Sequence, residues 1–252
     1  MKFDVFTLFP SIFHSYFEIS ILQKAIEKDL IQIEVHNIRD WTIDKHHVTD
    51  DTPYGGGGGM VMKAEPIFNS IEDVLGEKTA VPIILMSPMG RPLTTQIAVE
   101  LSQYPHIGIL CGRYEGVDER VIEHLVTDQI SVGDFVVTGG ELPALMMIDA
   151  VARFLPGVLG DPAGALNDSF GNGLLEYPHY TRPEKFREWQ VPEILLSGHH
   201  AKIEKWRREQ SLTRTYFLRP DLLTNANLSP EDIEFLLKLE AKEKLGHYQV
   251  LG

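Results

Sequence analysis

Cysteine is almost absent from the sequence, which has one, Cys111, among 252 residues. A lone cysteine excludes a disulfide framework within the chain and a cysteine-rich zinc site. Long apolar runs are absent as well, because the strongest candidate, residues 142–159, is interrupted by Asp149, Arg153 and Pro156. No segment reaches the roughly 18 apolar residues that a membrane-spanning helix needs. We therefore expect a cytoplasmic protein with no membrane anchor.

Positive charge is scarce, since 23 Lys and Arg stand against 36 Asp and Glu and give a net charge of −13. This balance disfavours general binding of polyanions. The exception is the segment 181–220, where nine basic side chains outnumber five acidic ones, with Trp189, Trp206, Tyr216 and Phe217 interleaved. The segment is explained either by a solvated helix face or by a surface that contacts phosphates and stacks on bases.

Strand-like and helix-like segments alternate through about the first 150 residues. Apolar stretches at residues 81–86, 107–110 and 130–137 are typical of parallel strands that are covered on both faces. Residues 10–28 and 142–155 have the apolar spacing of helices. This alternation predicts an α/β fold with a parallel sheet and helices on both of its faces.

The periodic pattern stops after residue 156, where glycine, proline and asparagine become frequent. Such a composition is typical of a linker or a mobile loop. Helical spacing returns further on, and Ser229 begins a helix with a capping hydroxyl, a proline and two acids. We therefore predict an α/β domain at residues 1–160, a flexible linker at residues 161–172 and a small all-helical domain at residues 173–252.

Three glycine-bearing turns follow the predicted strands, at residues 87–90, 111–120 and 131–143. In an open parallel sheet, ligands bind outside the carboxyl ends of the strands. Because these ends meet at one edge of the sheet, we expect the three turns to border one pocket. Backbone groups exposed in such turns suit the recognition of a small molecule.

Familiar nucleotide-binding and metal-binding motifs are missing. No G-x-x-x-x-G-K-[ST] phosphate loop occurs, and the glycine run at 55–59 neither follows a predicted strand nor completes G-x-G-x-x-G. A nicotinamide-dependent oxidoreductase is therefore disfavoured. No H-E-x-x-H occurs, and the histidine pairs at 46–47 and 199–200 point to opposite sides of any regular element, so we predict no metal site. Cys111, without a C-x-x-C partner, is better explained as a buried thiol than as a nucleophile.

Five longer strings carry a specific resemblance. They are PYGGG at residues 53–57, CGRYEG at 111–116, SVGD at 131–134, GGELPA at 139–144 and PHYTRP at 178–183. In these strings and their order, the chain resembles the bacterial tRNA (guanine-N1)-methyltransferases of the SPOUT superfamily over nearly its whole length. One departure is Gly58, where the family's glycine run has a proline.

The resemblance implies that the α/β domain contains a deep trefoil knot and that the methyl donor S-adenosylmethionine is bound there. Backbone groups would recognise its adenine and ribose, and Glu115 would bind a hydroxyl or the ammonium group. The family is also a homodimer whose active site straddles the subunits, and the apolar helix at 142–155 is compatible with burial at such an interface. The donor-binding positions of the family correspond here to Met86, Ser87, Pro88, Gly112, Glu115, Gly116, Ile130, Ser131, Val132, Gly133, Asp134, Phe135, Val136, Val137, Gly139, Gly140 and Pro143.

The resemblance also implies the chemistry. The family places its general base in an Asp-Ser-Phe string, here at Asp168, and an assisting arginine at Arg153. A carboxylate within hydrogen-bond reach can take the proton from N1 of a guanosine. An arginine can stabilise the negative charge that then develops on O6. The implied reaction is methyl transfer to N1 of the guanosine at position 37 of tRNA, on the 3′ side of the anticodon.

The partners follow from the same resemblance. The segment 181–220 becomes a tRNA-binding surface, and we expect tRNA and a second copy of the chain as partners, but neither DNA nor a membrane. Magnesium is a further cofactor associated with the family, although no ligand cluster in the sequence indicates a fixed site. Two alternatives remain, a SPOUT methyltransferase that acts on a different RNA nucleotide and a non-catalytic RNA-binding module.

Overall fold

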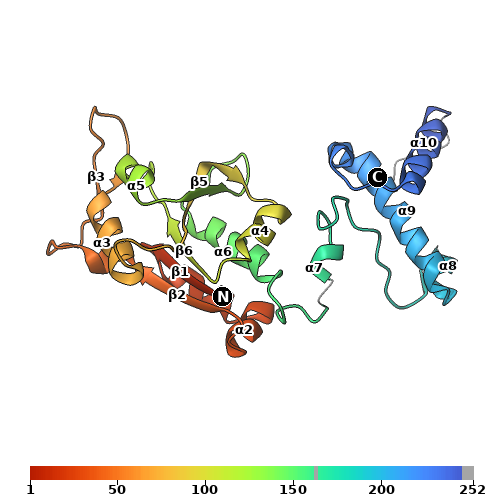
Figure 1. Ribbon diagram of the computed structural model, residues 1–252, viewed down its shortest axis with the longest axis horizontal. Coiled ribbons are helices and arrows are strands. Elements are labelled where there is room, and N and C mark those ends of the chain that lie inside the picture. The colour runs from red at the N-terminus through yellow and green to blue at the C-terminus, as the bar shows by residue number, and fades with distance from the viewer. Residues whose placement is uncertain (162–163, 246–252) are drawn as a thin grey trace. The chain divides into compact units, whose positions relative to one another are not determined.

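The computed structural model describes residues 1–161 and 164–245. The chain divides into two compact units, Met1–Pro162 and Ala163–Gly252, and we treat each by itself (Figure 1). The first unit holds a parallel sheet, and the second is mostly helical. Within the described residues, every helix is too short or too polar to span a membrane.

A five-stranded parallel sheet forms the centre of the first unit. Its strands are β1 (Lys2–Thr7), β2 (Gln32–Asn37), β5 (Ile83–Pro92), β6 (His106–Cys111) and β7 (Asp128–Ser131). They lie side by side in the order β2-β1-β6-β5-β7. This arrangement confirms the parallel α/β fold predicted from the sequence, whereas the trefoil knot stays a prediction.

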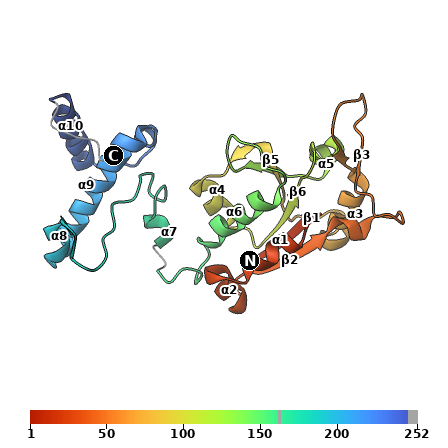
Figure 2. The ribbon, with the colours of Figure 1, turned by 180° about the vertical axis from the view of Figure 1, so that it is seen from behind.

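Helices cover both faces of this sheet (Figures 1 and 2). The elements outside the sheet are α1 (Ser11–Phe17), α2 (Ser20–Glu27), the 3-10 helix η1 (Ile38–Trp41), the strand pair β3 (Asp50–Asp51) and β4 (Val61–Met62), α3 (Ala64–Leu75), α4 (Thr95–Leu101), α5 (Glu119–His124) and α6 (Glu141–Ala152). On one face, Phe3 and Val5 belong to a core shared with α1, α2, α4 and α6. On the other face, Phe6 and Leu110 belong to a core shared with α3 and α5.

The amino-terminal helix predicted at residues 10–28 is divided into α1 and α2. Glu18 and Ile19 separate the two helices, and Ser20 has a φ of +59°. A left-handed backbone is costly for a residue with a Cβ and cannot continue a right-handed helix. Both helices contribute to the same core, through Phe13 of α1 and Leu22 of α2.

The edge formed by β5 and β7 also differs from the sequence prediction. β7 ends at Ser131, so residues 132–137 of the predicted strand form a loop. Gly133 in this loop has a φ of +148°, which breaks the extended conformation and favours glycine. β5 pairs with β7 at Met86 and again at Arg91, and the residues between them leave the ladder. Both departures put irregular chain at the carboxyl end of the sheet, where ligands bind in this fold class.

A charged cluster, here called the Asp4 cluster, lies across three strands. Asp4 on β1 is completely buried, and its two oxygens lie 2.6 Å from Nε2 of His36 on β2 and 2.5 Å from Nε2 of His106 on β6. Lys2 Nζ is 3.2 Å from the carboxylates of both Asp4 and Glu34. Burial alone would raise the pKa of Asp4, but hydrogen bonds from His36, His106 and Lys2 outweigh it and lower that pKa.

The regular elements described in the second unit are helices and one short hairpin. Its elements are α7 (Gly164–Asn167), β8 (Lys185–Phe186), β9 (Trp189–Gln190), α8 (Glu193–Leu196), α9 (His200–Leu218), the 3-10 helix η2 (Pro220–Thr224) and α10 (Pro230–Lys244). α9 packs against α10, where Arg208 donates to the two oxygens of Asp232 at 3.1 and 2.8 Å. Asp232 also completes a capping box with Ser229, so the helix start predicted there is confirmed.

Candidate active site

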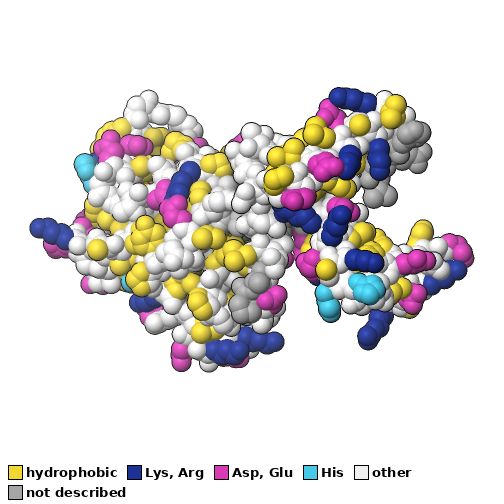
Figure 3. Space-filling view, turned by 45° about the vertical axis from the view of Figure 1, so that its right-hand side comes forward, with side chains coloured by type: hydrophobic (Ala, Val, Ile, Leu, Met, Phe, Trp, Pro, Cys, Tyr) yellow, Lys and Arg dark blue, Asp and Glu magenta, His cyan; other side chains and the backbone are white. Residues whose placement is uncertain are grey.

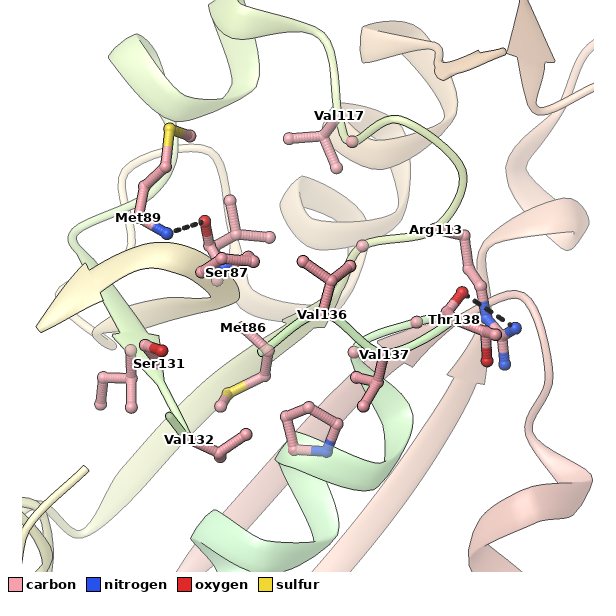
Figure 4. A pocket seen from close by; sticks show the side chains of 18 of the residues that line it. Met86, Ser87, Met89, Arg113, Val117, Ser131, Val132, Val136, Val137 and Thr138 are labelled. Carbon is pink, nitrogen blue, oxygen red and sulfur yellow. Dashed lines mark hydrogen bonds between the residues drawn. The ribbon is translucent and has the colours of Figure 1, made fainter. Parts of the chain in front are cut away.

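One cavity of about 440 Å³ lies at the carboxyl ends of β5, β6 and β7 (Figure 4). The three glycine-bearing turns that follow these strands line it, as the sequence predicts. Every predicted donor-binding residue except Asp134 is part of the lining. Asp134 is exposed in the turn after β7, and its neighbours Gly133 and Phe135 line the cavity in its place.

Apolar side chains make up much of the wall. Met86 at the end of the regular part of β5 lies near Val132, Val136 and Val137, which come from the loop after β7 (Figure 4). Pro143 in the first turn of α6 adds to the same wall. Such a surface suits a flat, apolar ring, while the polar backbone of the glycine turns supplies directed hydrogen bonds.

The turn after β6 is fastened to the glycine-rich loop that precedes β4. The backbone N–H of Glu115 donates to the carbonyl of Met60 at 3.0 Å, and that of Met62 donates to Gly116 at 2.9 Å. Gly59 lies so close that a Cβ on it would be 2.3 Å from Oε1 of Glu115. The glycine run, expected from the sequence only as a mobile loop, therefore helps to position a carboxylate that lines the cavity.

The turns after β6 and β7 cross at Gly140. Its N–H donates to the carbonyl of Gly112 at 2.8 Å, and a Cβ on it would be 2.8 Å from Cα of Cys111. Two backbones can come this close only where one of them has no side chain.

Burial raises the pKa of the Cys111 thiol well above its ordinary value, and the negative charge of Glu141 adds to the effect. A thiol kept protonated in this way is no nucleophile, in agreement with the sequence interpretation.

An ion pair that sequence reasoning missed holds the same two turns together. Arg113 Nε lies 3.1 and 2.9 Å from the two oxygens of Glu141, a residue that is 1% exposed. Thr7 donates to Glu141 at 2.8 Å, and the guanidinium of Arg113 lies 4.4 Å from the ring centroid of Phe9. Arg113 Nη1 also donates to the carbonyl of Thr138 at 3.3 Å (Figure 4). The signal in the sequence was the presence of two charges beside apolar strands, where a charge needs a partner.

The two predicted catalytic residues belong to different units. Arg153 follows the last residue of α6 in the first unit, and its N–H donates to the carbonyl of Asp149 at 3.4 Å. Asp168 follows α7 in the second unit, where its N–H donates to the carbonyl of Gly164 at 3.0 Å. Both residues have further interaction partners in the structure. Each residue is therefore placed at the end of a helix and outside the lining of the cavity.

Among residues 1–161 and 164–245, the side chains of Asp4, Glu34 and His36 are close enough to share a metal ion. Their carboxylates are already bound to the ammonium group of Lys2. A second cation there would be repelled by Lys2, so the Asp4 cluster does not suit a divalent metal. The cluster also lies on the amino-terminal half of β1, whereas the cavity is at the carboxyl ends of β5, β6 and β7.

Comparison with known proteins agrees with this architecture. The sequence model described as tRNA (Guanine-1)-methyltransferase TrmD matches residues 1–225. A tRNA (guanine-N(1)-)-methyltransferase of Dehalococcoides mccartyi is 54% identical over 244 residues, which are 96% of this chain and 98% of that protein. Proteins with the same name from Brevibacillus brevis and Geotalea uraniireducens are 54% and 55% identical, over 97% and 95% of this chain and 100% and 97% of their own. The resemblance seen in the sequence is confirmed, and the chain belongs to the tRNA (Guanine-1)-methyltransferase TrmD family.

Proposed function

We propose that the protein transfers a methyl group from S-adenosylmethionine to N1 of the guanosine at position 37 of tRNA. The observation that carries the proposal is the cavity at the carboxyl ends of three parallel strands, in a chain of this family. At about 440 Å³, the cavity falls within the range of roughly 300–1,000 Å³ that small-molecule sites occupy. Its apolar wall suits adenine, and Glu115 offers a carboxylate to a hydroxyl or to the ammonium group.

The bound donor supplies a methyl group on a positively charged sulfur. In the proposed reaction the bond from N1 to the methyl carbon forms as the bond from sulfur to that carbon breaks. Asp168 takes the proton from N1, so that N1 has a lone pair to donate. Arg153 binds O6, where negative charge develops as N1 loses its proton. A carboxylate and a guanidinium are suited to these two tasks.

The second unit is the proposed tRNA-binding part. The segment 181–220 has nine basic and five acidic side chains, whereas the whole chain has a net charge of −13. In Figure 3 the Lys and Arg side chains of this unit are spread over its surface among acidic ones. Contacts from such side chains to phosphates position an RNA without reading its sequence, and they weaken as the salt concentration rises.

We propose that the protein acts as a homodimer. α6 is buried along most of its length, but Leu142 is 58% exposed and Met146 is 51% exposed. Phe135 and Val136, in the loop that lines the cavity, are 56% and 83% exposed. Exposed apolar side chains on and near a functional site are typical of a surface that another chain covers. A second copy is the occupant that the family implies.

Magnesium is a further cofactor that we propose on the basis of the carboxylates at the cavity. The cavity lining contains the carboxylates of Glu115 and Glu119. Magnesium is usually held by one or two carboxylates together with water and substrate, rather than by a complete protein cage. We assign no step to the ion, and methyl transfer measured with and without magnesium tests the requirement.

Methyl transfer from labelled donor to a tRNA transcript with guanosines at positions 36 and 37 tests the proposed function. A matched transcript has adenosine at position 37. We expect label on the first transcript only. The Asp168→Asn protein, which cannot accept the N1 proton, should be slower by about 100-fold or more, because general base catalysis contributes at least that much. Asp221→Asn, an exposed aspartate of the same unit, is the control and should react at the normal rate.

Three other results would change the assignment. Label on both transcripts would keep the methyl transfer and reject position 37. Donor binding without transfer to either transcript would favour the non-catalytic RNA-binding alternative. Normal activity of the Asp168→Asn protein would reject Asp168 as the base.

A further inference from the structure

The hairpin formed by β8 and β9 presents two large aromatic rings to solvent. Phe186 and Trp189 are partners in its antiparallel register and therefore project from the same face. Phe186 is 58% exposed and Trp189 is 64% exposed. Their ring centroids are 6.0 Å apart, and the ring planes are inclined by 35°. A two-stranded hairpin of this size has no core of its own into which these rings could pack.

Arg187, at the tip of the hairpin, lies over both rings. Its guanidinium carbon is 5.3 Å from the centroid of Phe186 and 5.8 Å from that of Trp189. Arg187 has a φ of +56°, a left-handed backbone conformation that is unfavourable for residues other than glycine. The hairpin therefore holds a cation against two exposed rings in spite of a backbone cost.

This combination fits an unpaired nucleobase and its phosphate. Bases stack on aromatic rings and on arginine guanidinium groups, and proteins recognise single-stranded RNA loops mainly in this way. Lys185 of β8 is 3.5 Å from the carboxylate of Glu188 and is balanced by it, so Arg187 is the cation placed on the rings, with Arg182 just before the hairpin in the sequence. A nucleic acid offers a phosphate to Arg187 and a base to the two rings, whereas a second copy of this chain has no base to stack.

We propose that Phe186, Arg187 and Trp189 form a stacking surface for one unpaired base of the tRNA other than the methylated guanosine. Arg187 binds the phosphate next to that base. The proposal rests on the proposed function, because it takes tRNA as the substrate. It adds a second point of contact, which holds the RNA while the target guanosine leaves its own stack to reach the donor.

Equilibrium binding of tRNA to the full-length protein tests the surface. Trp189→Ala should weaken binding by about 5- to 100-fold, the range expected for loss of one stacked base. Trp189→Phe keeps a ring and should restore most of the affinity. Leu237→Ala removes an equally exposed apolar side chain from α10 and should bind normally. Arg187→Ala should reduce the slope of log affinity against log salt by about one, as expected for one lost phosphate contact.

The base itself is identified with transcripts that lack single bases in the anticodon loop. Removing the stacked base should weaken binding to the normal protein but have no further effect in Trp189→Ala, since the two changes remove the same contact. If Trp189→Ala binds every transcript as tightly as the normal protein, the stacking surface is wrong. If Trp189→Ala instead becomes monomeric in sedimentation, a second copy of the chain covers the hairpin and the proposal is also wrong.

The two proposals can fail separately. A normal protein that binds no tRNA and transfers no methyl group would overturn the proposed function and with it the partner of the hairpin. A normal protein that methylates tRNA while Trp189→Ala retains full affinity would overturn the stacking surface alone. Titration of the donor should give the same affinity in all hairpin variants, because the hairpin and the donor cavity share no residue.

Discussion

At the residue scale, the cavity depends on positions that have no side chain. Gly59 lies against the carboxylate of Glu115, and Gly140 lies against the backbone of Cys111. In both places a second segment of chain occupies the space that a Cβ would need. Glycine is required in these turns because it leaves room for the neighbouring segment, and not because it makes the turn flexible.

Gly59→Ala tests this interpretation. The added methyl group would overlap Glu115, and the φ of +87° at this position is unfavourable for alanine. We expect the affinity for S-adenosylmethionine to fall by about tenfold, which corresponds to roughly 1.4 kcal/mol, as measured by titration calorimetry. Gly58→Ala is the matched control, because nothing lies within 4 Å of its added methyl group and its φ is not positive. Equal affinities in the two variants would remove Gly59 from the positioning of Glu115.

The turns that line the cavity could be predicted from the sequence, but the contacts that hold these turns in place could not. The turn at 111–116 follows a strand that ends in a recognisable apolar run, so its place at the edge of the sheet could be predicted. The contact between Gly59 and Glu115 could not, because it joins segments that no local pattern relates. Asp134, predicted as a donor contact from the family resemblance, is exposed and outside the lining, while its neighbours Gly133 and Phe135 line the cavity, so its contact with the donor stays a prediction.

At the scale of elements, the Asp4 cluster joins three neighbouring strands. Asp4 on β1 binds His36 on β2 and His106 on β6, and all these contacts are formed by side chains on one face of the sheet. No local pattern in the sequence indicates this cluster, because its members lie on strands that are far apart along the chain. Strand order places Asp4 among its partners, because β1 lies between β2 and β6, each of which carries a histidine next to Asp4.

The Asp4 cluster predicts how stability depends on pH. Because the pKa of Asp4 is lowered in the folded state, its contribution to stability is present above the pKa of about 3.9 of an unfolded aspartate. The contribution is lost as the pH falls through the lower, folded pKa. Asp4→Asn should lower the free energy of unfolding at pH 7 by about 2 kcal/mol or more and flatten the loss of stability below pH 4, in urea titrations across pH. Asp221→Asn, which removes an exposed ion pair with Arg219, should change little. An unchanged acid profile in Asp4→Asn would count against the role of the cluster.

Element boundaries show where local pattern was insufficient. The predicted strand at 130–137 stops at Ser131, because the positive φ of Gly133 breaks the extended conformation, and the residues that follow line the cavity. The hairpin at residues 185–190 lies in a domain predicted to be all-helical. Its two strands are identified by their antiparallel pairing across a tight turn. In both cases a local backbone conformation, at Gly133 and at Arg187 in the hairpin turn, decided where the strand ends.

At the scale of the whole molecule, the proposed dimer can be tested through α6. Met146→Glu would place a charge in an apolar interface, where an unpaired carboxylate is strongly unfavourable. We expect sedimentation to detect a shift from dimer to monomer and the methylation rate to fall with it. Ile43→Glu is the control, because Ile43 is 82% exposed in the same unit and lies outside the surface of Leu142, Met146, Phe135 and Val136. A Met146→Glu protein that stays dimeric would reject this face as the interface.

The order of the strands has a consequence for how the chain folds as it is made. β1 lies between β2 and β6, and Lys2 pairs with His106. The central strand pair therefore joins residues about a hundred positions apart, which is a high contact order. Such pairing slows folding, because the entropy of closing a long loop is lost before the contacts between the strands can stabilise it. A growing chain can pair β1 with β2 early, but the free edge of β1 stays open until β6 has left the ribosome. The first hundred residues alone therefore leave one edge of β1 unpaired, and an unpaired strand edge is the kind of surface through which incomplete chains aggregate.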